Sequence, residues 1–212
     1  MIGRIIARDL ARALRGGAWL PVAFFLLVAA VIPFAVGPDA RLLARIGGGA
    51  LWIAALTAAL LPIERLIEPD RADGVLDQYC IRGIDGLEVA LAKIVAHWLT
   101  FGPPLMLAAL PGAALLGLDA AALGRTLLSL AIGTPALAAL AVAVAALTSG
   151  LRASAALGAL LLVPLAVPLL IFAASAAGSG DPGAFKLEAA VALLILVGAP
   201  PVTAAALKAL RT

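Results

Sequence analysis

The chain has 212 residues, of which 64% are hydrophobic and only 13% are charged. Soluble domains are roughly half apolar and a quarter charged, so this composition excludes a soluble globular protein and indicates an integral membrane protein. The net charge of +3 does not indicate nucleic acid as a partner, because the basic residues are scattered in the way that topology signals are. A single cysteine, Cys80, excludes an internal disulfide and a cysteine-based metal cluster.

Residues 2–15 place four arginines at helical spacing, namely Arg4, Arg8, Arg12 and Arg15. This stripe predicts an amphipathic helix that lies in the membrane interface. Gly16 and Gly17 end the helix, so the interfacial segment covers residues 1–18. The alternative is a basic flank that only fixes the orientation of the first span.

Six intervals contain no Asp, Glu, Lys or Arg, and each is at least eighteen residues long. They are residues 16–38, 46–63, 94–118, 126–151, 153–180 and 189–207. A helix needs about 20 residues to cross the hydrocarbon core, so we predict an all-α membrane protein with six transmembrane helices. The spans leave no room for a second domain, and one membrane domain should cover residues 1–212. Because the intervals lack charged residues, no carrier for ions or protons is predicted inside the membrane.

The second span follows a short loop over residues 37–45, which we expect outside the membrane with Arg41 and Arg45. Its start, Gly47-Gly48-Gly49, permits very close backbone approach and indicates either a helix contact or an unwound start. Trp52 lies about a turn further on. Structural packing is the preferred role for Trp52, and contact with a flat ligand is the alternative.

The polar segment, residues 64–88, carries seven of the twelve acidic residues. A charge at the bilayer centre costs about 3 kcal/mol on insertion scales, so this segment must face water or another protein. We predict that it forms a docking surface for a soluble partner. Pro69 suits a helix start, and Val75, Leu76 and Tyr79 share one face of a short amphipathic helix parallel to the membrane, opposite Asp73 and Asp77.

The third span should begin near Gly86, because Asp85 and Glu88 have the spacing of a capping box. His97 and Trp98 follow in this span. A lone histidine beside an aromatic could ligate haem iron or relay protons. A hydrogen-bonded interfacial histidine is the more common case, and the chain has no second histidine. The sequence contains no Walker A motif, and acids in a polar loop are usually solvated or paired with arginine, so we expect no catalytic residues.

The basic residues also predict the orientation. With the N-terminus inside, eleven of the fifteen are cytoplasmic and four are outside, which favours cytoplasmic termini and a cytoplasmic polar segment. The inside set is Arg4, Arg8, Arg12, Arg15, Arg65, Arg71, Arg82, Lys93, Arg152, Lys208 and Arg211. The outside set is Arg41, Arg45, Arg125 and Lys186.

A series of short motifs in a fixed order runs along nearly the whole chain. They are Gly37-Pro38, Leu42-Leu43, Arg45-Ile46, Trp52, Glu64-Arg65-Leu66, Asp70, Asp73-Gly74, Gln78, Leu91-Ala92-Lys93, His97-Trp98, Gly133-Thr134-Pro135, Gly150-Leu151 and Pro168-Leu169-Leu170-Ile171-Phe172. Together they resemble the haem exporter protein B (CcmB) family, the permease subunits of cytochrome c maturation. The chain departs from the family pattern at Asp77-Gln78-Tyr79, where Glu-Gln-Leu is common, and at Gly102-Pro103-Pro104, where Gly-Leu-Pro is expected.

The resemblance implies an ABC-2 exporter-like permease in the bacterial inner membrane, with the polar segment as a coupling helix for a separate ATPase. It implies ATPase contacts at Glu64, Arg65, Asp70, Asp73, Gly74 and Gln78, and it makes Trp52, His97 and Trp98 candidate haem or interface contacts. The implied partners are two copies of the ATPase, a second copy of the permease, a haem-handling C subunit, a small D subunit, membrane lipid and, indirectly, a periplasmic haem chaperone. Haem would be transported cargo and no cofactor would be stably bound. The alternatives are an exporter permease for another apolar substrate and a force-transmitting subunit that does not itself conduct haem.

Overall fold

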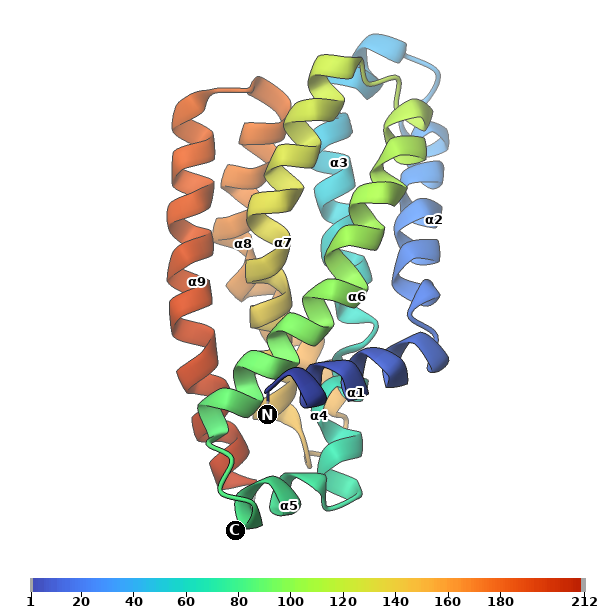
Figure 1. Cartoon of the computed structure of the whole chain (residues 1–212). Helices are drawn as coiled ribbons and strands as arrows, with labels where there is room; N and C mark the ends of the chain where they lie inside the picture. Colours follow the sequence, from blue (N-terminus) through green and yellow to red (C-terminus); the bar gives the residue numbers. More distant parts are fainter. Residues whose placement is uncertain (1, 211–212) are drawn as a thin grey trace.

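The computed structural model describes residues 2–210, and in this part of the chain nine helices and no strand are found. Six helices are long and apolar enough to cross a membrane, and they stand side by side as a bundle (Figure 1). They are α2 (Trp19–Val36), α3 (Ala40–Leu60), α6 (Gly86–Leu115), α7 (Ala120–Thr148), α8 (Ser154–Ser179) and α9 (Pro182–Ala209). The prediction of an all-α membrane protein with six spans is confirmed. Arg211, which was counted in the orientation argument, and the last residue of the 1–212 domain lie outside the described residues.

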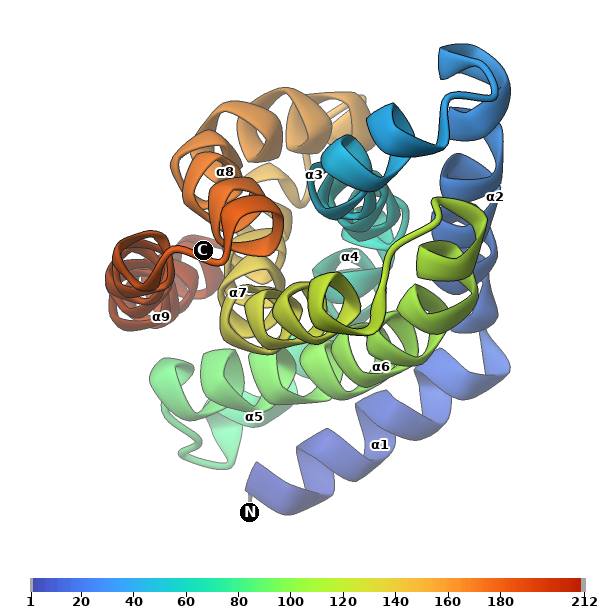
Figure 2. The ribbon, with the colours of Figure 1, turned by 90° about the horizontal axis from the view of Figure 1, so that it is seen from above.

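Three further helices lie at one end of the bundle, together with the last turns of α9 (Figure 1). They are α1 (Ile2–Arg15), α4 (Ile63–Ala72) and α5 (Val75–Ile81), and we call this end of the molecule the polar end. The predicted helix over residues 2–15 is confirmed. Helix α1 runs across the bundle along α6 (Figure 2). Gly17, with a φ of 97°, makes the turn from α1 into α2.

The second span begins earlier than predicted. Asp39 caps α3, and its carboxylate accepts hydrogen bonds from the backbone N–H groups of Arg41 (3.0 Å) and Leu42 (3.1 Å). The expectation that residues 37–45 form a loop is therefore wrong for Arg41 and Arg45, which lie in the first two turns of α3. An aspartate at this position satisfies amide groups that have no partner within the helix, which explains why α3 starts here.

The three glycines of α3 are helical and serve close packing. A Cβ atom at Gly48 would overlap Ala177 of α8, and one at Gly47 would press on Leu118 in the connection before α7. Of the two readings of this run, a helix contact and an unwound start, the structure confirms the contact.

Helix α7 occupies the middle of the bundle, between α6 on one side and α8 and α9 on the other (Figure 2). Almost every residue from Ala136 to Ala146 is buried, and most of them are alanines. Small side chains allow neighbouring helices to approach closely, so the centre of the fold is built on backbone proximity.

The polar segment forms two helices. Helix α4 starts at Ile63, six residues before Pro69, so the prediction that Pro69 starts a helix is wrong. Burial of Ile63 and Ile67 on one face explains the earlier start. The predicted amphipathic helix is confirmed as α5, with Leu76 and Tyr79 buried. Helix α6 begins at Gly86 after Asp85, as predicted, although the Asp85 side chain makes no capping hydrogen bond.

Candidate functional site

Asp70 of α4 is the centre of an ion-pair network at the polar end. Its side chain is completely buried, and Lys93 Nζ of α6 and Arg8 Nη2 of α1 each lie 2.6 Å from its Oδ2 atom. Arg12 of α1 pairs with the other oxygen, Oδ1. Asp70 therefore does not lie on the surface that was predicted to dock a soluble partner. Its position instead fixes α1 to α4 and α6.

Asp9 completes the network. It pairs with Arg8 at 2.6 Å and with Lys93 at 3.1 Å, so three cations surround two carboxylates. Burial opposes ionisation of the Arg8 guanidinium, but hydrogen bonds and charge attraction from Asp9 and Asp70 outweigh it and raise the pKa of Arg8. Lys93 is almost entirely buried, and such a charge is tolerated only when it is paired and hydrogen-bonded.

Helix α4 is also tied to the connection between α7 and α8. Glu68 accepts hydrogen bonds from Ser149 Oγ at 2.6 Å and from the Gly150 amide at 2.8 Å. Glu64 accepts from Ser154 Oγ at 3.1 Å and from the Ala155 amide at the start of α8. Helix α4 thus joins α1, α6 and the α7–α8 connection, three parts of the fold that are distant in sequence.

Two of the predicted docking residues are exposed, and no side-chain hydrogen bond or ion pair ties them to other described parts of the chain. Asp73 and Gln78 point away from the bundle, and Gly74 makes the turn between α4 and α5 with a φ of 67°. Ile81, at the end of α5, is 86% exposed. We call four of the exposed residues of this tip, Asp73, Asp77, Gln78 and Ile81, the α5 face.

The other two predicted docking residues, Glu64 and Arg65, are exposed but are engaged within the chain. Glu64 is bonded to the start of α8, as described above, and Arg65 Nη1 donates to the carbonyl oxygen of Gly16 at 2.6 Å. Arg65 therefore holds the turn between α1 and α2. Both residues position α4 whether or not a partner also contacts them.

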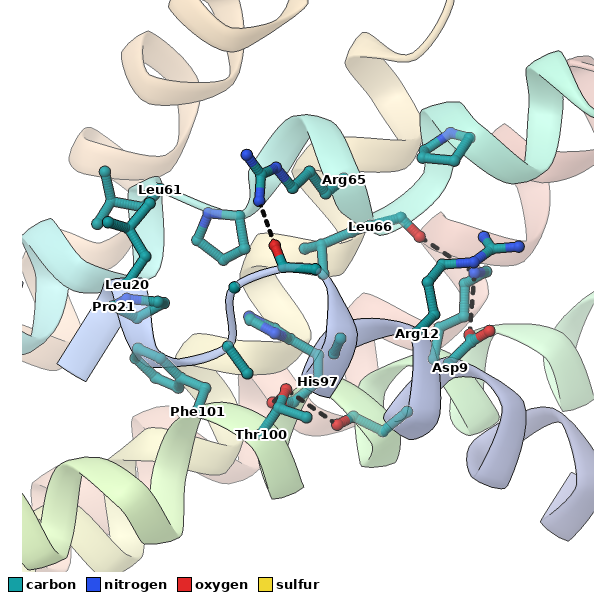
Figure 3. A pocket seen from close by; sticks show the side chains of 18 residues that line it. Asp9, Arg12, Leu20, Pro21, Leu61, Arg65, Leu66, His97, Thr100 and Phe101 are labelled. Carbon is teal, nitrogen blue, oxygen red and sulfur yellow. Dashed lines mark hydrogen bonds and ion pairs between the residues drawn. The ribbon is translucent and has the colours of Figure 1, made fainter. Parts of the chain in front are cut away.

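A cavity of about 330 Å³ lies between α1, α4, α6 and the start of α2 (Figure 3). Its walls are mostly apolar, with Leu20, Pro21 and Phe101 on one side, and Arg12 and Arg65 among its polar groups. His97 lines it and stacks on Phe101 with 5.4 Å between ring centroids, and its buried Nε2 atom has no hydrogen-bond partner among residues 2–210. The cavity can accept a small amphiphilic ligand, because apolar walls with a few converging polar groups are typical of such sites.

The two tryptophans grouped with His97 lie elsewhere. Trp52 is completely buried in α3, and its Nε1 donates to Ser129 Oγ of α7 at 2.8 Å, which agrees with the packing interpretation. Trp98 Nε1 donates to Thr134 Oγ1 of α7 at 3.2 Å. Neither lines the cavity, so the structure does not bring Trp52, His97 and Trp98 into one site.

Glu188 was missed by the sequence reasoning. It is completely buried in α9, and its Oε1 atom lies 2.9 Å from Ser129 Oγ. The prediction that no span contains a buried charged residue type is therefore wrong, because α9 begins at Pro182, before the charge-free interval. The signal that could have found it is Asp181-Pro182, a capping residue followed by proline at the first helical position.

Sequence similarity to known proteins extends over nearly the whole chain. The family model for the CcmB protein matches residues 1–211. Heme exporter protein B of Rhodobacter capsulatus is 44% identical over 203 residues, which cover 95% of this chain and 92% of the relative. The proteins of the same name from Haemophilus influenzae and Escherichia coli K12 are 43% and 38% identical, and the aligned parts cover 90% and 83% of this chain and 89% and 81% of the relatives.

Proposed function

The chain belongs to the CcmB protein family, and we propose that it is the permease subunit of a haem exporter that serves the biogenesis of c-type cytochromes. The names of its relatives and their coverage of nearly the whole chain support this function. The six-span bundle gives the chain the architecture that a membrane permease requires.

The membrane is proposed to be the bacterial inner membrane, with the polar end in the cytoplasm. Ten of the basic residues in the described part of the chain belong to the polar end or to the connections beside it, and the four that were predicted outside belong to the other half. Positive residues are retained on the cytoplasmic side during insertion, which supports this orientation.

The α5 face is proposed to dock a separate ATPase subunit. One observation carries this proposal. The exposed tip, where Ile81 is 86% exposed, directly follows α4, and α4 is held by ion pairs and hydrogen bonds to three other parts of the fold. A movement imposed on α5 would pass into α4, and from there to α1, α6 and the α7–α8 connection. The subunit would then receive work from ATP hydrolysis carried out by its partner.

A co-purification experiment tests this docking role. Replacing Ile81 by Glu and Asp77 by Arg should reduce recovery of the ATPase subunit with the permease by at least about tenfold, because the centre of an interface carries most of its binding energy. Arg4→Glu, an exposed charge on α1 at the same end, is the matched control and should leave recovery unchanged. Full recovery with the α5 variant would refute docking at this face.

Haem is proposed to contact the cavity beside His97. At about 330 Å³ the cavity can hold only part of a porphyrin, whose ring would lie against the apolar wall and whose carboxylates would face Arg12 or Arg65. In the complex purified with its partners, His97→Ala should lower the haem content, whereas Trp98→Phe, at a neighbouring residue that does not line the cavity, should not. Equal haem content in both variants would exclude a contact through His97.

A further inference from the structure

The face of α7 that meets α8 and α9 carries three residues at successive turns: Arg125, which is half-buried, and Ser129 and Gly133, which are buried. Glu188 of α9 lies against Ser129 and Gly133, where a Cβ atom in place of the glycine hydrogen would come within 3.1 Å of its Oε1 atom. Glu188 is seven residues into a membrane-spanning helix and is completely buried. A carboxyl group in this place is costly and calls for a physical explanation.

The hydrogen-bond geometry around Ser129 indicates the protonation state of Glu188. Ser129 Oγ lies 2.8 Å from Trp52 Nε1, 3.2 Å from the Ala173 carbonyl oxygen and 2.9 Å from Glu188 Oε1. A hydroxyl has one proton to donate and two lone pairs. With Glu188 ionised, the carbonyl and the carboxylate would compete for that one proton. With Glu188 protonated at Oε1, it donates to Ser129, Ser129 donates to Ala173, and Trp52 donates to Ser129, so all three contacts are hydrogen bonds.

Within residues 2–210 no cation is paired with Glu188, and Lys186, two residues earlier on α9, is exposed to the surroundings of the bundle. The Oε2 atom of Glu188 is buried without a hydrogen-bond partner among these residues. The basic residue on the facing side of α7 is Arg125, one turn before Ser129. The Arg125 side chain lies against Gly180, and its buried Nε atom has no hydrogen-bond partner among the described residues.

The charged residues of the other neighbouring helices do not reach Glu188 either. Helix α8 contains none, and α3 has only Arg41 and Arg45 in its first two turns. The titratable residues of α6 are Glu88, Lys93 and His97, which belong to the half of α6 nearest the polar end. A carboxyl group with this surrounding takes up a proton in preference to staying ionised.

We propose that Glu188 is a proton-binding site inside the membrane bundle. It is a neutral carboxylic acid in the packed bundle, and it releases its proton to water only when water reaches it. In that step the O–H bond at Oε1 breaks, the electron pair stays on the carboxylate, and the proton passes to the water. The inference does not depend on the identity of the exported substrate.

Infrared spectroscopy of the full chain in lipid nanodiscs tests the proposal. At pH 7 the wild-type protein should show the carbonyl-stretch band of a protonated carboxylic acid, and Glu188→Gln should lack it. Glu88→Gln, an exposed carboxylate at the start of α6, is the matched control and should retain the band. A wild-type spectrum without any band that disappears in Glu188→Gln would show that Glu188 is ionised and would overturn the proposal.

The pH dependence of stability gives a second readout. The unfolded chain's carboxyl ionises above about pH 4.3, so unfolding of a protonated Glu188 releases one proton, and stability falls as pH rises. Relative to Glu188→Gln, the unfolding equilibrium constant of the wild type should increase about tenfold for each pH unit above about pH 5, up to the pH at which Glu188 ionises in the folded protein. Parallel pH profiles would contradict the proposal. If Glu188→Gln does not fold, Ser129→Ala replaces it, and an acid band at an unshifted frequency would be the contradicting result.

Discussion

Asp70 is the residue on which the packing of the polar end depends most. It is completely buried and pairs with Arg8, Arg12 and Lys93. Removing one partner from a buried network leaves uncompensated charge, so Asp70→Asn should lower the free energy of unfolding by about 3–5 kcal/mol. Thermal unfolding in detergent measures this loss, and hydrogen exchange should become faster in α1.

Asp73 provides the control for this variant. It lies three residues further along the chain and is exposed, so Asp73→Asn should change the free energy of unfolding by no more than about 0.5 kcal/mol. Equal losses in the two variants would contradict the central role of the Asp70 ion pairs.

Gly133 is a second residue whose role is sharply testable. A Cβ atom there would collide with the ring of Trp52, which is fully buried and held by Ser129. Gly133→Ala should therefore destabilise the protein by about 1–3 kcal/mol, as overpacking of a dense core does. Gly124→Ala, on the same helix but facing open space, should be neutral or stabilising by up to about 1 kcal/mol. The difference between the two thermal midpoints measures the effect.

At the scale of elements, the spans were predictable because one requirement governs them. A helix in lipid must be apolar over about 20 residues, and six charge-free intervals met this condition. The ends were less predictable, because they depend on local capping: Asp39 extended α3 and Asp181 extended α9 beyond their charge-free intervals. That extension is the reason Glu188 was left out of the predicted sixth span but lies within α9 in the structure.

The contacts of the polar segment could not be predicted from sequence. Asp70 was correctly seen as part of a polar segment between spans, but its partners Arg8 and Lys93 lie 62 and 23 residues away. Charge type alone does not pair residues across such separations, because the pairing is set by how α1 packs on α6 and α4 packs on α7. The arginine stripe of α1 is the sequence feature that pointed to a carboxylate partner, because two of its four arginines, Arg8 and Arg12, pair with Asp70.

The turn between α4 and α5 offers a prediction at this scale. Gly74 has a φ of 67° and a Cβ atom there would meet nothing, so the cost of a substitution comes from the backbone alone. Gly74→Ala should destabilise the turn by about 1–2 kcal/mol, and Gly74→Asn by less, because asparagine tolerates this conformation. Hydrogen exchange of α5 amides measures the loosening. Equal exchange in the Ala and Asn variants would show that the backbone conformation is not the cause.

For the whole molecule, the proposed orientation can be tested with the protein's own cysteine. Cys80 is exposed on α5, at the polar end. A membrane-impermeant maleimide should label it in inside-out vesicles and leave it unlabelled in right-side-out vesicles. In a Cys80→Ser background, Ser179→Cys at the exposed end of α8 should give the opposite result. Labelling of both positions from the same side would refute the arrangement of the bundle in the membrane.

The close contact between α3 and α8 constrains how the protein is made. Gly48 of α3 packs against Ala177 of α8, and the Trp52 indole donates to Ser129 of α7. The partners of α3 are therefore synthesised 77 or more residues after it. During synthesis α3 therefore sits in the bilayer with its glycine surface and its indole N–H unmatched. A chain truncated before α8 leaves the glycine surface of α3 without its partner, and we expect membrane proteases to degrade it faster than the full chain.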